Sequence, residues 1–460
     1  MSSVNSQIEK QAHSEERRYW VRSGFYTLLE RAVGLLFAFG TAVILLRVLS
    51  KEDFATFTLF LLITYFVEIG RSGLIQNGLV RFLSTSRDNP QEYASFTTAA
   101  LVLNLAYSLV SVLLLWLGEQ WIIDTWHAPK LAEMLPLYYV IVFIMAFFYH
   151  FNFVQQANFE FRGIFWGTFF FRGAKFVWAS LCVFTGMAIR LDHLVVAKLV
   201  GVSIGCAASW LYTSAYLRHT LSVNWKHVGD LLRYGKYVLG TNLSTMLAKN
   251  IDKLSLGHLL GPAAFAVYDA AGKITQLVEA PSFSIAAVVF PKSAEQMEKN
   301  GADGVGELYV RSVSVILAII VPLLILVFVF AKPIMVLFAG PAYIESAGVL
   351  RLTVFFGLFM PFAVQFGTIL DSTGRPALNF GVTLLTAIVN LCLSYLFVPQ
   401  FGMMGAALAT LTGYFITFLL MQYLLFRDFG VRWWRAFVYL PHFYRLAFQI
   451  AWHRLSMRIS

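Results

Sequence analysis

The chain has little charge, little cysteine and no recognisable catalytic motif. Only 13% of its 460 residues are charged, compared with about 25% in soluble domains. The three cysteines lie far apart in apolar runs, which predicts neither a disulfide framework nor a metal site. The nine histidines show no ligand spacing, and no nucleotide-binding motif appears. We therefore expect no catalytic residue, no metal and no enzymatic activity.

Hydrophobic residues are abundant instead. They make up 58% of the chain, and the mean hydropathy is +0.68. Residues 1–22 are polar, and the apolar segment after them is too long for a cleavable signal peptide. Apolar runs near 20 residues predict an all-α polytopic membrane protein with about twelve transmembrane helices. The expected spans are 24–46, 54–76, 94–117, 132–154, 161–184, 194–217, 236–258, 262–290, 309–331, 346–370, 377–397 and 402–426.

Lysine and arginine are distributed unequally between the two sides of these spans. With a cytoplasmic N-terminus, 21 lie on the cytoplasmic side and 5 on the opposite side. This bias follows the positive-inside rule and predicts that both termini are cytoplasmic, in a bacterial cytoplasmic membrane. The net charge of +10 therefore reflects topology, and no nucleic-acid partner is expected.

The two halves of the chain are related by an internal repeat. Residues 49–57 align with residues 260–268, and at the same offset Glu68 aligns with Glu279. Six spans separate the copies, which predicts a parallel repeat of two six-helix lobes. The expected divisions are an N-terminal tail 1–22, an N-lobe 23–217, a linker 218–235, a C-lobe 236–426 and an interfacial amphipathic tail 427–460.

Charges inside the expected spans are the most informative feature. Each costs about 2.5–3.5 kcal/mol in lipid, so most must face a partner or water. Lys249, Asp252 and Lys253 share one helical face. After an expected tight turn at Gly261-Pro262, Asp269 and Lys273 repeat the spacing on the next helix. Two facing polar stripes predict a hydrated chamber.

Two interpretations of these charges are open. In the first they form structural pairs, Glu68 with Arg71, Asp269 with Lys273, and Glu30 or Arg31 across helices. In the second, cations outnumber carboxylates and bind an anion. The best candidates for spare cations are Arg172, Lys175, Lys249 and Lys253. Lys198 and Arg351 lie near span ends and are expected to snorkel towards water.

Short motifs in order along the chain resemble a known family. They are Arg47-Val-Leu-Ser-Lys-Glu-Asp-Phe-Ala, Asn250-Ile-Asp-Lys-Leu-Ser-Leu-Gly-His-Leu-Leu-Gly-Pro, Phe290-Pro-Lys, Leu370-Asp-Ser-Thr-Gly-Arg-Pro376 and Val398-Pro-Gln-Phe-Gly-Met-Met-Gly-Ala-Ala-Leu-Ala409. The chain thereby resembles the polysaccharide transporters, flippases of O-antigen or other lipid-linked oligosaccharides, within the multidrug/oligosaccharidyl-lipid/polysaccharide exporter superfamily. It departs from the family pattern at Ala55 and Ala266, where glycine is common.

The resemblance implies two lobes forming a V, with the first, second, seventh and eighth spans lining a central cavity. The implied activity is alternating-access flipping of a polyprenyl-pyrophosphate-linked oligosaccharide, with membrane lipids and polysaccharide assembly proteins as partners. The cationic substrate-binding candidates are Arg31, Arg71, Arg172, Lys175, Lys249, Lys253 and Lys273. The candidates for structural pairing or ion coupling are Glu30, Glu68, Asp252, Asp269 and Glu279. No cofactor is expected beyond a coupling proton or sodium ion, at Asp269 or Glu279.

Two other function classes are open. A multidrug extruder of the same fold would use acidic residues to attract cationic drugs, and the excess of buried Lys and Arg argues against it. A membrane glycosyltransferase, polymerase or ligase usually needs a large outer loop, but the longest expected outer loop, 118–133, is short.

Overall fold

The protein is almost entirely helical. The computed structural model describes residues 26, 29–441 and 444–445, and this part of the chain contains no β-strand. Helix Leu29–Val48 comes first. It is followed by α2 (Lys51–Arg71), a π-helix (Ser72–Gln76), α3 (Asn77–Thr85), α4 (Pro90–Trp126), α5 (Leu131–Ala157), α6 (Phe161–Thr185), α7 (Leu191–Thr213) and α8 (Trp225–Leu260). Then come α9 (Pro262–Val329), α10 (Ala331–Ala339), a 3-10 turn (Pro341–Tyr343), α11 (Ser346–Thr353), a 3-10 segment (Val354–Leu358), α12 (Met360–Ser372), α13 (Pro376–Phe401), α14 (Met403–Phe429) and α15 (Arg435–Val438).

Local sequence signals set several helix ends. Ser50 caps α2 by accepting a hydrogen bond from the Asp53 amide (3.1 Å), and Asn89 caps α4 in the same way. Gly261 separates α8 from α9 with a φ of 83°, as expected of the Gly-Pro turn. The starts of α2 and α9, Lys51 and Pro262, match the repeat offset.

Ten described helical segments are long and apolar enough to cross a membrane. They agree with ten of the twelve expected spans, and α9 supplies two of them, Pro262–Phe290 and Glu295–Val329. The other two expected ranges, 161–184 and 236–258, form α6 and most of α8. The all-α polytopic fold is therefore confirmed.

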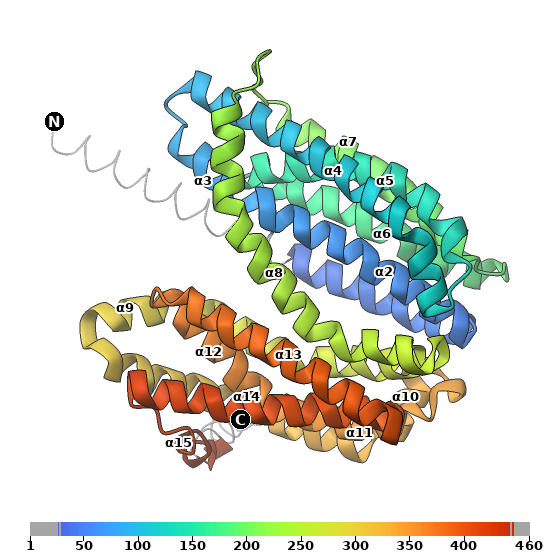
Figure 1. Ribbon diagram of the computed structural model, residues 1–460, viewed down its shortest axis with the longest axis vertical. Coiled ribbons are helices and arrows are strands. Elements are labelled where there is room, and N and C mark those ends of the chain that lie inside the picture. Colours follow the sequence, from blue (N-terminus) through green and yellow to red (C-terminus); the bar gives the residue numbers. More distant parts are fainter. Residues whose placement is uncertain (1–25, 27–28, 442–443, 446–460) are drawn as a thin grey trace, which may run out of the picture. The chain divides into compact units, whose positions relative to one another are not determined.

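The chain divides into two compact units, residues 1–243 and 244–460. In the first unit α6 packs on α7, and α5 packs on both α4 and α7 (Figure 1). In the second unit α9 packs on α11 and α12, and α13 packs on α14. The division falls inside α8, and α8 already begins at Trp225, so much of the expected linker 218–235 is helical.

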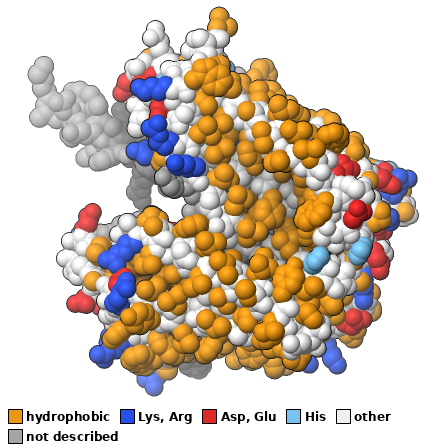
Figure 2. All heavy atoms as spheres, viewed as in Figure 1, with side chains coloured by type: hydrophobic (Ala, Val, Ile, Leu, Met, Phe, Trp, Pro, Cys, Tyr) orange, Lys and Arg blue, Asp and Glu red, His pale blue; other side chains and the backbone are white. Residues whose placement is uncertain are grey.

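Hydrophobic side chains cover the lengths of the helices in Figure 2, whereas Lys and Arg gather at helix ends. This arrangement suits helices that stand in lipid with their ends in the headgroup layers. Each unit also has its own buried core. In the second unit, α9, α12 and α14 enclose aromatic residues such as Tyr309, Phe362 and Phe418.

Candidate functional site

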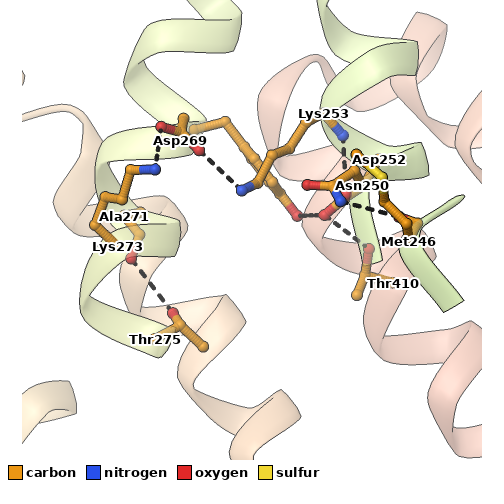
Figure 3. Close-up of polar contacts among 10 residues, drawn as sticks. Met246, Asn250, Asp252, Lys253, Asp269, Ala271, Lys273, Thr275 and Thr410 are labelled. Atoms are coloured by element: carbon orange, nitrogen blue, oxygen red, sulfur yellow. Dashed lines mark hydrogen bonds and ion pairs between the residues drawn. The ribbon is translucent and has the colours of Figure 1, made fainter. Parts of the chain in front are cut away.

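The intramembrane charges form one cluster in each unit. In the second unit the centre is Asp269 on α9, whose side chain is 1% exposed. Lys253 Nζ of α8 lies 2.8 Å from Asp269 Oδ1, and Lys273 Nζ lies 3.3 Å from Asp269 Oδ2 (Figure 3). The expected Asp269–Lys273 pair is therefore confirmed. Lys253 was expected to be a spare cation, and this is wrong because a buried carboxylate neutralises it.

Asp252 anchors a second part of the same cluster. Its Oδ2 accepts a hydrogen bond of 2.6 Å from Tyr268 of α9 and a longer one of 3.4 Å from Thr410 of α14. The Lys253 backbone amide donates to Asp252 Oδ1 at 2.8 Å. These donors compensate for the burial of Asp252, which is 8% exposed. The carboxylate thus joins three helices of one unit.

In the first unit the central pair is Glu68 of α2 and Lys198 of α7. Lys198 Nζ lies 3.0 Å from Glu68 Oε1, and Tyr149 of α5 donates to Glu68 Oε2 at 3.2 Å. The Lys198 side chain is only 3% exposed, and its ammonium also lies 5.2 Å from the ring centre of Tyr138. The expectation that Lys198 snorkels is therefore wrong. Spacing in the sequence does not predict this pair, because the two residues lie on different helices, 130 residues apart in the chain.

Arg71 is buried separately from this pair. It is 1% exposed and donates to Ser108 Oγ at 2.9 Å and to the Val142 carbonyl at 3.1 Å. Its guanidinium also lies 5.6 Å from the ring centre of Tyr107. The expected Glu68–Arg71 ion pair is not formed, because Lys198 reaches Glu68 from α7 while Arg71 turns towards α4 and α5. Helices α4 and α5 thus hold the Arg71 side chain in place.

Arg172 and Lys175 on α6 are two intramembrane cations without a fixed partner among the described residues. Neither forms an ion pair or hydrogen bond with another described residue. Arg172 is exposed and lies against Gly34 of the first helix, where a Cβ atom would come within 2.5 Å of Nη1. Glu30 lines the same narrow crevice. Lys175 is half-buried and interacts electrostatically with Lys198, Glu68 and Arg172.

The remaining candidates take different positions. Arg31 is exposed on the first helix and forms no ion pair with another described residue. Glu279 is half-buried on α9, within electrostatic range of Lys253. The Lys249 side chain lies outside the described residues. No group of three or more His, Cys, Asp or Glu in the described part of the chain could hold a metal ion.

The charge balance differs between the two clusters. The described intramembrane cations of the first unit are Arg31, Arg71, Arg172, Lys175 and Lys198, and its described intramembrane carboxylates are Glu30 and Glu68. In the second unit the described side chains of the cluster are two lysines, 253 and 273, and three carboxylates, 252, 269 and 279; Lys249 is a further intramembrane lysine of α8. Among the described side chains the excess of positive charge therefore lies in the first unit, where only Lys198 of these five cations pairs with a carboxylate.

Sequence comparisons cover most of the chain. The profile of a family described as polysaccharide biosynthesis protein matches residues 44–348. An uncharacterized membrane protein of Methanocaldococcus jannaschii is 31% identical over 196 residues, 42% of this chain and 38% of that relative. The probable low-salt glycan biosynthesis flippase Agl15 of Haloferax volcanii is 22% identical over 219 residues, 48% of this chain and 46% of Agl15. The matched region thus spans less than half the length of these curated relatives.

Similar solved structures cover nearly the whole chain. An inward-facing multidrug resistance transporter of the MATE family has a TM-score of 0.73 at 16% identity, covering 85% of this chain and 94% of that one. The lipid II flippase MurJ in an inward closed conformation has a TM-score of 0.72 at 15% identity, covering 93% of both chains. These likenesses show a shared two-lobe transporter fold.

Proposed function

The chain belongs to the polysaccharide biosynthesis protein family, and we propose that it flips a polyprenyl-pyrophosphate-linked oligosaccharide across the cytoplasmic membrane. The glycan would be a repeat unit of an O-antigen or exopolysaccharide, carried from the inner to the outer leaflet by alternating access. The name of the Haloferax relative, a glycan biosynthesis flippase, supports this substrate class. The distribution of Lys and Arg supports cytoplasmic termini.

The observation that carries the proposal is the pair of unneutralised cations on α6. A lipid pyrophosphate bears about two negative charges, and Arg binds phosphate oxygens through two parallel hydrogen bonds. Arg172 and Lys175 lie one helical turn apart, so both can approach one pyrophosphate. Lys198 is already neutralised by Glu68, whereas neither α6 cation pairs with a described carboxylate.

The charges of the second unit are proposed to have a different role. Its two described lysine side chains, Lys253 and Lys273, pair with Asp269, so they attract an anion less strongly. Proton or sodium coupling at Asp269 or Glu279 stays a prediction. It is checked by measuring flipping under an imposed pH gradient and an imposed sodium gradient, in separate vesicles.

Proteoliposomes carrying a fluorescent polyprenyl-pyrophosphate oligosaccharide test the proposal. We expect R172Q and K175Q to slow flipping strongly, and R351Q to leave it unchanged. Arg351 is the matched control because it is a span-end cation of the second unit whose Nε only donates to the Phe328 carbonyl (3.3 Å). If both α6 variants flip the substrate at the wild-type rate, Arg172 and Lys175 do not belong to the substrate site.

A multidrug extruder is the second candidate, since the MATE transporter shares the fold. The buried carboxylates of the second unit, Asp252 and Asp269, are the feature that would attract a cationic drug. Dye efflux by the wild-type protein, without oligosaccharide flipping in the same vesicles, would favour this function over the flippase.

A further inference from the structure

The segment after the last span, residues 430–440, is docked against the second unit. Gly430 ends α14 with a φ of 62°, and the chain then turns back. Val431 and Ala436 are 3% and 1% exposed, and both belong to the core formed with α9, α12 and α14. Trp433 packs edge-on against Phe418 of α14 at 5.4 Å between ring centres. This part of the tail is therefore a fixed element of the fold.

The outward side of this segment is both apolar and basic. Trp434 is 52% exposed, Phe437 43% and Val438 71%. Arg432 and Arg435 are exposed beside them. The Arg435 amide donates to the Arg432 carbonyl at 3.0 Å, so one turn brings the two arginines close together.

The basic residues next to this segment form ion pairs, whereas Arg432 and Arg435 do not pair with a described residue. Arg427 and Arg375 both pair with Asp428, at 2.6 and 2.7 Å. Arg432 and Arg435 make no side-chain ion pair or hydrogen bond with another described residue. Two arginines one turn apart, with no ion pair to a described carboxylate, attract an anion, and they favour one with several oxygens in a plane or tripod.

We propose that residues 430–440 bind the phosphate group of an anionic membrane lipid. Arg432 and Arg435 hold the phosphate, while Trp434, Phe437 and Val438 enter the adjoining acyl region. The occupant is a lipid because the segment begins one residue after a membrane span, where hydrocarbon meets headgroups. Exposed tryptophan beside arginine is the composition of that layer. This proposal is independent of the transport function.

Native mass spectrometry of the full-length protein in detergent tests the site. The protein is titrated with phosphatidylglycerol and, in parallel, with phosphatidylcholine of the same acyl chains. We expect tighter binding of phosphatidylglycerol, weakened about fivefold by R432Q or R435Q and about thirtyfold by both changes, from the attraction of each basic residue to anionic lipid. R427Q is the matched control and should bind both lipids as the wild type does.

A second measurement places the lipid at Trp434. Bromine atoms on the lipid quench the fluorescence of nearby tryptophans. In vesicles with brominated phosphatidylglycerol we therefore expect less quenching of the tryptophan fluorescence in W434F than in the wild type. The proposal is overturned if the double arginine variant, with an unchanged melting temperature, keeps its preference for phosphatidylglycerol. It is also overturned if the wild type binds a soluble acidic peptide in preference to the lipid, since the surface would then be a protein-docking site.

Discussion

Lys198 of α7 pairs with Glu68 of α2 at 3.0 Å, although 130 residues separate them in the chain. The pair lies inside the first unit, with Tyr149 as a third member. A buried pair of this kind contributes little net stability, but each partner is costly to remove alone. Because Lys198 is the cation that pairs with Glu68, Arg71, Arg172 and Lys175 form no ion pair with that carboxylate.

Removal of one member of this pair should destabilise the protein. We expect K198M to lower the free energy of unfolding by at most about 3–5 kcal/mol, because Glu68, which is 20% exposed, loses its ion-pair partner. The double variant K198M/E68L should recover most of that loss, since no charge remains unpaired. Thermal unfolding in detergent measures both. An additive loss in the double variant would contradict the account.

Asp269 should be the most sensitive carboxylate of the second unit. D269N removes the carboxylate that both Lys253 and Lys273 pair with, and we expect a loss of about 3–5 kcal/mol. K273M should cost less, because Lys253 still neutralises Asp269. The control E307Q breaks an exposed pair with Arg311 and should cost at most about 1 kcal/mol. Equal melting temperatures for D269N and E307Q would show that the cluster is not structural.

Two glycine variants test the packing of α13 against α14. A Cβ atom at Gly405 would collide with the backbone carbonyl of Phe397, which cannot move aside as a side chain can. We expect G405A to cost about 1–3 kcal/mol through this overpacking. G381A is the control, because nothing lies within 4 Å of the added atom. Chemical denaturation compares the two, and an unaffected G405A would mean that the helices are less closely packed.

Charge and geometry at residue 172 can be separated in the flipping assay. R172K keeps the positive charge but loses the planar pair of donors that fits a phosphate. We expect R172K to flip more slowly than the wild type and faster than R172Q. Raising the salt concentration should slow the wild type more than R172Q, because one screened attraction has already been removed in the variant. Identical rates for R172K and R172Q would assign the effect to geometry alone.

Features that depend on neighbours in the chain were predictable from the sequence. Hydrophobic run length gave the helices, and the repeat offset gave the matching starts of α2 and α9. The Asp269–Lys273 pair was predictable too, because four residues on one helix always place two side chains on the same face. The Gly261 turn followed from the inability of other residues to adopt its conformation easily.

Features that depend on contacts between distant helices were not predictable. Glu68 has Arg71 three residues away, and spacing alone favours that pair, but helix packing brings Lys198 of α7 closer. Lys253 was expected to be unpaired for the same reason, because its partner, Asp269, lies on the next helix.

The sequence by itself determined how many charges lie in the membrane and their sign, because burial in lipid follows from hydrophobic length. Only the tertiary structure decided which charges neutralise one another, since an ion pair requires two side chains within about 4 Å. That difference leaves Arg172 and Lys175 as the α6 cations available to a ligand.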